Sequence, residues 1–423
     1  MRNEAKGSTR MVANAERLCF VLGKQHSMPR RRILKVFNRY LLYGGEENSV
    51  EKIHRLLEED YEVIRMPLDS REWVGEGAPT IFSQAWRTVY NPESLRRFER
   101  AVAEHKPDLA LFHNVFPVGS PSLYHGAMRM GVPVIQYAHN YRPYCVAGTL
   151  YAKGRVITEP LRGNYWPEIY HGVWQRSVVK SAIMAVAMKL LIRSGWLDSV
   201  KAWVCVSEFM RDHFIEAGLP RERVHGLRHA WIPMPEPPPV TDGNYYLFLS
   251  RLVVEKGVEV LLRAWEKISR SLGARAPQLW IAGEGPLEDK VREAAAKNPN
   301  IKYCGMLSGQ AKRDVISNCR AMLVPSVWWE PLGLVTCEAY DYSKPVLAAG
   351  SGGLSETVLP GITGFLHEPG NMDSLISDVL CMETLPTEHR LEMGRAGRRF
   401  LLEHFGVAQW KARMGAIIDG VMQ

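Results

Sequence analysis

Two carboxylates, Glu330 and Glu338, lie eight positions apart in the second half of the chain. The apolar run 321–325 predicts a short buried strand before the first, and the helix-like stretch 335–342 carries the second. Between them, backbone N–H groups would lie at the N-terminus of that helix, where anions bind. The groups concerned belong to Gly333, Leu334 and Val335. An anion flanked by two carboxylates suits a ligand with phosphates in its middle and hydroxyl groups at both ends. A nucleotide-sugar has that layout.

Two cations follow a predicted strand in the same half of the chain. Arg251 comes directly after strand 245–250, and Lys256 lies five residues further on. A guanidinium group together with an ammonium group can hold a diphosphate and neutralise its charge as it leaves. The alternative is a pair of ordinary surface cations in a loop. The presence of Glu330 and Glu338 in the same half of the chain favours the diphosphate interpretation.

Glycines follow two further predicted strands of the second half. Gly283 and Gly285 come at the end of strand 278–283, and Gly352-Gly353 follow strand 345–349. Glycine lets a ligand approach the backbone closely, although a tight turn without a ligand explains the same residues equally well. Glu356 would open the helix after the second loop, where a carboxylate can also act as a cap.

The first half of the chain offers polar residues at comparable places. Gly44-Gly45 follows the first predicted strand and could contact a phosphate, or could form a plain left-handed turn. His113 and His139 each end a predicted strand, where a histidine would face the ligand-binding side and could bond a sugar hydroxyl or move a proton. A lone histidine is usually structural, and of the two we prefer His139 as a functional residue.

Length and composition indicate a globular protein of two domains. The chain has 423 residues, of which 46% are hydrophobic and 23% charged. The net charge of +8 is compatible with phosphorylated ligands or anionic lipid, and no nucleic-acid-binding motif is present. Seven scattered cysteines without a Cys-x-x-Cys pair argue against structural zinc and disulfides, and fit a reducing cytoplasm. They are Cys19, Cys145, Cys205, Cys304, Cys319, Cys337 and Cys381.

Short apolar strands alternate with helical segments in both halves, which predicts two doubly wound α/β domains with parallel sheets. A proline-rich stretch, 231–239, predicts the interdomain linker. Ligands of such sheets bind at the carboxyl ends of the strands, so facing domains would share one cleft. The remaining predicted strands are 33–37, 61–66, 108–113, 133–138 and 202–206 in the first half, and 300–304 and 363–367 in the second. A helix is expected over 48–60.

No stretch is apolar and long enough to span a bilayer. The nearest is 177–192, interrupted by Lys180 and Lys189, which could be an amphipathic helix on a membrane but is better explained as a buried helix. Residues 1–27 make a poor signal peptide and are expected to form a flexible basic tail, or to precede a true start at Met28.

Together these motifs resemble the retaining nucleotide-sugar glycosyltransferases of family 4, the "group 1" enzymes with the GT-B fold, over roughly residues 32–420. The spacing of Glu330 and Glu338 matches the family's E-x7-E element. Arg251 with Lys256-Gly257, the Gly283–Pro286 turn and the Gly352-Gly353-x-x-Glu356 loop also match. Three segments of the first half resemble a bacterial polysaccharide-assembly branch of the family. They are Tyr43-Gly44-Gly45-Glu46, the Phe112–Pro117 segment and His139–Arg142.

The resemblance implies a role for each of these positions. Glu338 would bind the ribose hydroxyls and Glu330 those of the donor sugar, while Arg251 and Lys256 would hold the diphosphate. Gly44 and Gly45 would contact the phosphate from the other domain, and His139 would lie near the sugar. Gly283, Gly285, Gly333, Leu334 and Val335 would complete the nucleotide site. No metal is implied, which agrees with the lack of an Asp-x-Asp element.

The resemblance implies a GT-B organisation: a tail (1–30), an acceptor-binding domain (31–235) and a nucleotide-sugar-binding domain (240–404), with helix 405–423 packing back on the first domain. It also implies transfer of a sugar, with retention, from a nucleoside-diphosphate donor to a saccharide or lipid-linked acceptor, without a cofactor. We expect a UDP-sugar before a GDP-sugar, and a cytoplasmic location with peripheral contact to anionic membrane. The alternatives are a GT-B epimerase or sugar phosphorylase, and a non-catalytic binding subunit.

Overall fold

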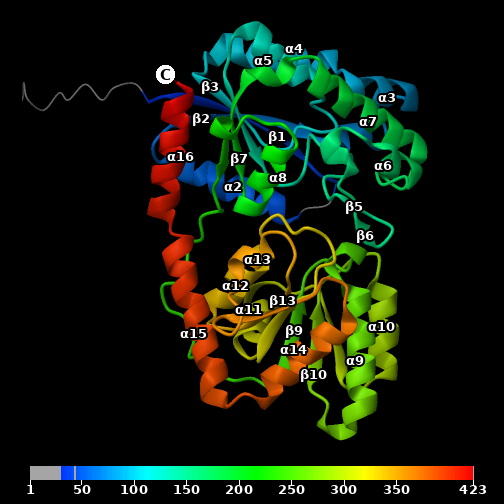
Figure 1. Ribbon diagram of the computed structural model, residues 1–423. Coiled ribbons are helices and arrows are strands. Elements are labelled where there is room, and N and C mark those ends of the chain that lie inside the picture. The colour runs from blue at the N-terminus through cyan, green and yellow to red at the C-terminus, as the bar shows by residue number, and fades with distance from the viewer. Residues whose placement is uncertain (1–29, 42–43, 423) are drawn as a thin grey trace, which may run out of the picture.

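The computed structural model describes residues 30–41 and 44–422, so the expectations for residues 1–27 lie outside it. Two α/β domains follow one another along the chain, each built on a six-stranded sheet whose neighbouring strands all run parallel. Figure 1 shows the two domains facing each other, with the C-terminal helices along one side. The prediction of two doubly wound domains is confirmed.

The first sheet has the strand order β2-β1-β3-β4-β7-β8. Its central strands are continuous apolar runs because helices cover both faces of the sheet. The strands are β1 (Arg32–Arg39), β2 (Glu62–Asp69), β3 (Leu109–Phe112), β4 (Val134–Ala138), β7 (Val200–Cys205) and β8 (Val224–Gly226). The helices are α2 (Gly45–Glu58), α3 (Ile81–Val89), α4 (Pro92–His105), α5 (Ser122–Met130), α6 (Trp166–Tyr170), α7 (Val178–Arg193) and α8 (Glu208–Glu216), and β5 (Tyr151–Ala152) and β6 (Arg155–Val156) form a hairpin.

The second sheet has the strand order β11-β10-β9-β12-β13-β14. The strands are β9 (Tyr245–Leu249), β10 (Gln278–Ala282), β11 (Ile301–Gly305), β12 (Ala321–Val324), β13 (Val346–Ala349) and β14 (Gly364–His367). The helices are α9 (Val258–Leu272), α10 (Glu288–Lys297), α11 (Gly309–Ser317), α12 (Leu334–Asp341), α13 (Leu354–Thr357), α14 (Met372–Thr384), α15 (Thr387–His404) and α16 (Val407–Val421). Buried apolar side chains such as Tyr246, Leu323 and Leu347 form a core with the apolar sides of α9 and α14.

Two local predictions for the first domain differ from the structure. Helix α2 begins at Gly45 and not at residue 48, and Gly44 before it is extended with φ −149°, so a left-handed turn at Gly44 is wrong. Strand β8 was missed because three residues, Val-His-Gly, carry no periodic apolar signal.

Helix α7 has one buried and one exposed side. Met184, Met188 and Leu191 are fully buried, whereas Val179 and Val186 are exposed. The interpretation of this segment as a buried helix therefore describes only half of its surface. None of the helices within residues 30–41 and 44–422 is long and apolar enough to cross a bilayer.

Helix α16 lies against the first domain at the end of the chain (Figure 1). The indole of Trp410 donates to the Tyr137 hydroxyl at 3.3 Å, and the guanidinium of Arg413 donates to the Gly226 carbonyl. The preceding helix α15 packs on α12 of the second domain.

The proline-rich segment between the domains is held at defined points. The carboxylate of Asp341 accepts from the Trp231 indole at 3.0 Å, from the Met234 amide at 3.1 Å and from Arg398 at 2.8 Å. The two domains therefore face each other through an anchored connection.

Candidate active site

The ion pair between Lys256 and Glu330 is the central feature of the second domain's ligand-binding edge. Lys256 ends a short 3₁₀ turn after β9, and Glu330 follows β12, the neighbouring strand. The ammonium group contacts the Glu330 carboxylate, and both side chains are largely buried, with exposed fractions of 17% and 4%. The ammonium also lies 5.2 Å from the centre of the Trp328 ring. Neighbouring strands thus bring together two residues that are 74 positions apart.

The first domain lies directly opposite this pair. The rings of Tyr141, which follows β4, and Trp329, which follows β12, are 6.4 Å apart. Burial, and after it the charge of Glu330, raise the pKa of Tyr141 well above its usual value. Trp329 also contacts Phe209 at 5.1 Å and His213 at 4.3 Å, both on α8. The carboxyl ends of the two sheets therefore face each other, which is where ligands of such sheets bind.

Glu338 and Arg251 belong to the same edge of the second sheet as the pair. Glu338 lies in the second turn of α12, and its carboxylate is 2.9 Å from the ammonium of Lys312. Its side chain is 30% exposed, so its oxygens are accessible to a ligand. Arg251 is exposed, and its side chain has no ion pair or hydrogen bond with the rest of residues 30–41 and 44–422. The structure thus places Arg251, Lys256, Glu330 and Glu338 in loops and a helix at one edge of one sheet.

The glycines of the second domain are required by the packing of its own loops. Gly283 and Gly285 have φ values of +137° and +153°, and a Cβ on Gly283 would lie 1.9 Å from the Ser250 carbonyl oxygen. A Cβ on Gly352 would lie 2.3 Å from the Glu330 carbonyl oxygen. These loops are pressed against the backbone that carries Arg251 and Glu330. The tight-turn interpretation therefore explains these glycines without a ligand.

Gly44 and Gly45 are in a different situation. A Cβ added to either would meet no atom of the described chain within 4 Å. Gly44 precedes α2, so the free N–H groups of that helix start here. Packing against the described residues does not require glycine at these two positions, and contact of Gly44 or Gly45 with a phosphate stays a prediction.

Glu356 joins the two domains. Its carboxylate accepts hydrogen bonds from the backbone N–H groups of Glu208 and Phe209, at the start of α8, and from Arg228 at 3.3 Å. A carboxylate in this place satisfies free N–H groups and complements the helix dipole. Glu356 therefore does cap a helix, as one interpretation of the sequence expected. The capped helix is α8 of the opposite domain and not the helix that contains Glu356.

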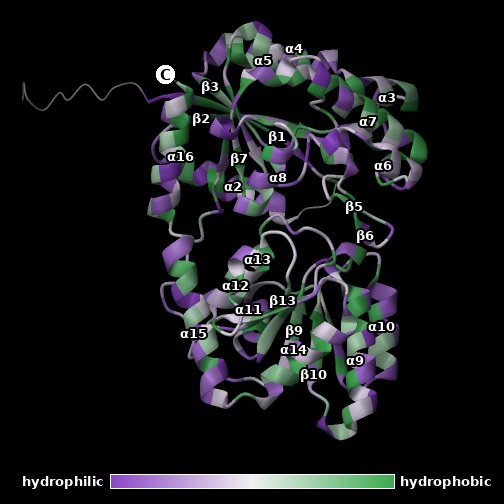
Figure 2. Ribbon diagram, in the orientation of Figure 1, coloured by the Kyte–Doolittle hydropathy of each residue, from purple (hydrophilic) through white to green (hydrophobic). Residues whose placement is uncertain are grey.

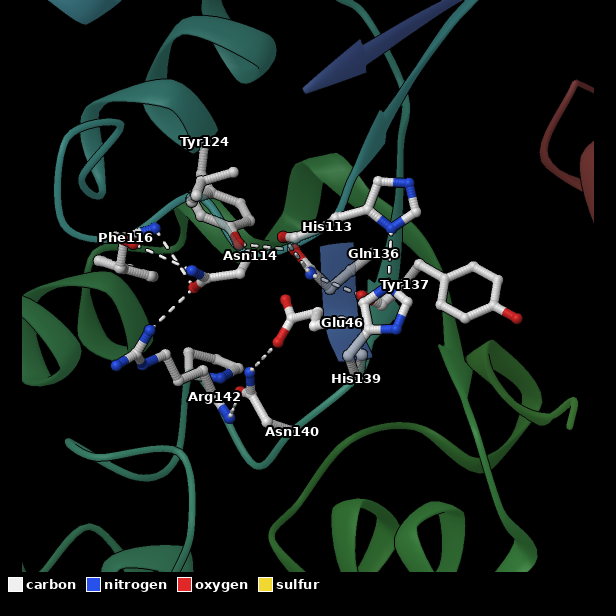
Figure 3. A pocket seen from close by; sticks show the side chains of 13 residues that line it. Glu46, His113, Asn114, Phe116, Tyr124, Gln136, Tyr137, His139, Asn140 and Arg142 are labelled. Carbon is white, nitrogen blue, oxygen red and sulfur yellow. Dashed lines mark hydrogen bonds between the residues drawn. The ribbon is translucent and has the colours of Figure 1, made fainter. Parts of the chain in front are cut away.

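A pocket at the carboxyl ends of β3 and β4 contains Glu46 and His139 (Figure 3). One oxygen of Glu46 accepts from the Tyr40 hydroxyl at 2.9 Å and from the Asn140 amide at 3.1 Å, while the other is buried without a partner among the described residues. Arg142 reaches across to Asn114 at 2.9 Å. Glu46 belongs to the sequence motif that follows the first strand, but nothing in the sequence indicated that one of its oxygens is buried in this half-buried residue.

The two predicted histidines form a pair in this pocket. His113 is completely buried and lines the pocket together with His139, so contact of its ring with a ligand stays a prediction. Its Nδ1 lies 2.8 Å from Nε2 of His139, and the His139 ring stacks on His229 at 5.2 Å. Burial lowers the pKa of both His113 and His139 well below 6.5. His139 is therefore neutral near pH 7, and its buried Nδ1 has no partner among residues 30–41 and 44–422.

The structure thus distributes the candidate residues over two facing edges. Glu330, Glu338, Arg251 and Lys256 lie on the second domain, and His139, Gly44 and Gly45 lie on the first. Gly333, Leu334 and Val335 form the start of α12 between the two carboxylates. No group of three histidine, cysteine or carboxylate side chains suited to a metal ion occurs within the described ranges.

Replacing Glu46 by glutamine is expected to stabilise the protein above neutral pH. Burial raises the pKa of Glu46 from 4.5 to about 7, partly offset by the hydrogen bond from Tyr40. The stability that protonated Glu46 contributes is therefore fully present below pH 4.5 and is lost as the pH rises through about 7. Urea unfolding at about pH 5 and about pH 8 should show the advantage of the variant growing with pH. A constant difference would mean that Glu46 ionises in the folded protein as it does in the unfolded chain.

Two family models match this chain along most of its length. The model described as "Glycosyltransferase Family 4" matches residues 44–228, and the one described as "Glycosyl transferases group 1" matches residues 233–400. The chain belongs to the group 1, family 4 glycosyltransferases. Two models of one family thus divide this glycosyltransferase between its two α/β domains.

Curated relatives match parts of this glycosyltransferase. An uncharacterized glycosyltransferase from Methanocaldococcus jannaschii is 31% identical over 32% of this chain and 34% of its own length. A GDP-mannose-dependent monoacylated alpha-(1-6)-phosphatidylinositol monomannoside mannosyltransferase from Corynebacterium glutamicum is 32% identical over 41% of this chain and 45% of its own length. The chain therefore matches less than half of the length of either relative.

A solved structure supports the fold over almost the whole glycosyltransferase. Anabaena HepE in complex with UDP and glucose superposes with a TM-score of 0.63 at 15% identity. The superposition covers 92% of this chain and 100% of the other. At this level of identity the likeness shows the GT-B fold and no more.

Proposed function

We propose that this glycosyltransferase moves a sugar from a nucleoside-diphosphate donor to a saccharide or lipid-linked saccharide acceptor. The observation that carries the proposal is the Lys256–Glu330 pair at the edge of the second sheet, with exposed Arg251 at the same edge and Tyr141 opposite. A binding scaffold has no physical need for a largely buried ion pair there, since such a pair costs desolvation energy. Binding of a phosphate-bearing ligand would explain why this ion pair lies at the edge of the sheet.

Each charged residue has a distinct place in the proposed reaction. Lys256 has three N–H donors, so it can keep its contact with Glu330 and still donate to a phosphate oxygen. Arg251 would bind the same diphosphate through its guanidinium fork. Glu330 would accept from hydroxyls of the donor sugar, and Glu338 from the ribose.

We propose that transfer proceeds with retention at the anomeric carbon. The bond between that carbon and the phosphate oxygen breaks, and the diphosphate leaves with the electron pair while Lys256 and Arg251 neutralise its charge. The acceptor hydroxyl attacks from the same face and gives its proton to the departing phosphate oxygen. Neutral His139 would lie near the sugar and orient it through Nδ1.

In the proposed reaction each of the two domains binds one of the two substrates. Residues 240–404 would bind the donor, and residues 31–235 with helix 405–423 the acceptor. The glycines Gly44 and Gly45 would contact the phosphate from the acceptor side, and Gly283 and Gly285 would shape the nucleotide site. A UDP-sugar is preferred and a GDP-sugar is the alternative. Solved structures of similar fold were determined in complex with UDP, and a curated relative is described as GDP-mannose-dependent.

Thermal unfolding in the presence of UDP-, GDP- and ADP-sugars tests this function. A donor at 100 times its dissociation constant should stabilise the protein by about 2.7 kcal/mol, because it binds only the folded state. The stabilising donor should then yield a glycosylated product only when an acceptor is supplied. Failure of every donor to raise the melting temperature would contradict the proposal, and conversion of the donor alone would indicate an epimerase.

A further inference from the structure

Helix α3 presents large apolar side chains to solvent. Phe82 is 89% exposed, and Ile81 and Trp86 are also exposed on the same nine-residue helix. Side chains of this size normally contribute to a core, and scattered single exposures need no explanation, whereas a cluster does. The cluster on α3 therefore indicates a surface that binds a membrane or another molecule.

Two further helices extend this surface. Helix α7 packs against both α3 and α6. Tyr170 and Trp166 on α6 are exposed, and so are Val179 and Val186 on α7. Figure 1 shows the three helices together at one end of the first domain, and apolar segments recur along α3 and α7 in Figure 2. The exposed side chains of α3, α6 and α7 are called the apolar–basic face below.

Cations without acidic partners lie among these apolar side chains. Arg176, Lys180, Lys189 and Arg193, in or beside α7, are all exposed. None of the four forms an ion pair with any described residue, and Lys180 bonds only the neutral Gln175 amide. The three helices contain a single carboxylate, Glu168, which is buried and accepts from Cys145 and Val146. The face therefore carries a net positive charge that nothing on it neutralises.

We infer that the apolar–basic face docks on an anionic lipid bilayer. Tryptophan and tyrosine prefer the boundary between headgroups and acyl chains, and interleaved lysine and arginine bind anionic headgroups. A second copy of the chain would place these unpaired cations against each other, which disfavours self-association. The inference does not depend on the proposed function, because vesicle binding needs no donor or acceptor.

Sedimentation of the full chain with lipid vesicles tests the inference. The protein should bind vesicles of phosphatidylcholine with phosphatidylserine, and not vesicles of phosphatidylcholine alone. Lys180→Glu with Lys189→Glu should weaken binding by about tenfold or more, because each cation near an anionic surface contributes separately. Arg263→Glu with Arg275→Glu is the matched control. It changes the charge equally at two exposed positions of the second domain and should leave binding unchanged.

The apolar contribution requires its own variant. Phe82→Ser with Trp86→Ser should also reduce vesicle binding by about tenfold or more, whereas Ile362→Ser with Leu402→Ser, at exposed sites of the second domain, should not. All eight positions are exposed, so unchanged melting temperatures would show intact folding. Equal binding to neutral vesicles, equal loss in the controls, or a wild-type dimer that Phe82→Ser with Trp86→Ser dissociates would overturn the inference.

Discussion

Replacing Lys256 by methionine is expected to lower kcat/KM for sugar transfer by about 100- to 1,000-fold. The ammonium is the cation nearest to Glu330, and the proposed reaction places on it part of the charge that develops on the leaving diphosphate. The loss should appear mainly in kcat, because that charge is larger in the transition state than in the bound donor. Steady-state kinetics with the donor found by thermal unfolding measures it.

Folding has to be separated from catalysis in this experiment. Methionine at position 256 leaves the carboxylate of Glu330 buried without its cation, which typically costs about 3–5 kcal/mol of stability. The double variant Lys256→Met with Glu330→Gln removes both charges and should regain much of that stability. It should remain as inactive as the single variant. If the double variant also regained activity, Lys256 would act only through folding and the proposed role would be wrong.

Replacing Glu338 by alanine should weaken binding of the nucleoside diphosphate by roughly 10- to 150-fold. This range corresponds to a charged hydrogen bond of about 1.5–3 kcal/mol. The carboxylate is part-exposed at the sheet edge and would accept from the ribose hydroxyls. Calorimetric titration of the nucleotide and of its 2′,3′-dideoxy analogue provides the measurement. The wild type should prefer the ribose form, and the variant should bind the two alike.

Lys312→Ala is the matched control for Glu338. It removes the ion-pair partner at 2.9 Å but leaves the carboxylate, so nucleotide affinity should change by no more than about threefold. A Glu338→Ala variant that still distinguished ribose from dideoxyribose would place the ribose elsewhere on the protein.

The elements that carry the second-domain residues were predictable because their signals are local. The apolar run before Glu330 forms β12, and the stretch containing Glu338 forms α12 with bounds shifted by one residue. All six strands of that sheet coincide with the predicted apolar runs, which are bounded by turn residues. A parallel sheet then places loops of distant sequence at the same edge, which is how Lys256 reaches Glu330.

Contacts between the domains were not predictable from the sequence. Glu356 caps a helix that begins 148 residues earlier, and no local pattern identifies that partner. Tyr141 lies within electrostatic reach of Glu330 only because the two sheets face each other. Within the first domain, the sequence likewise did not indicate that His113 and His139 form a hydrogen-bonded pair.

The surroundings of Glu46 and Gly283 were also not predictable from the sequence. The raised pKa of Glu46 depends on burial, and burial of a helix-start carboxylate follows from tertiary packing. For Gly283, the sequence left a ligand approach and a tight turn equally open. The backbone of Ser250, which lies against Gly283, explains the glycine without a ligand, and a ligand near Gly283 stays a prediction.

A crystal structure with the stabilising nucleoside diphosphate bound is the most direct test of the proposed donor site. The diphosphate should lie within hydrogen-bond distance of Lys256 and Arg251, with the ribose hydroxyls on the Glu338 carboxylate. The terminal phosphate should point toward Glu330 and the first domain. A nucleotide bound away from these four residues, or one whose ribose points away from Glu338, would contradict the account.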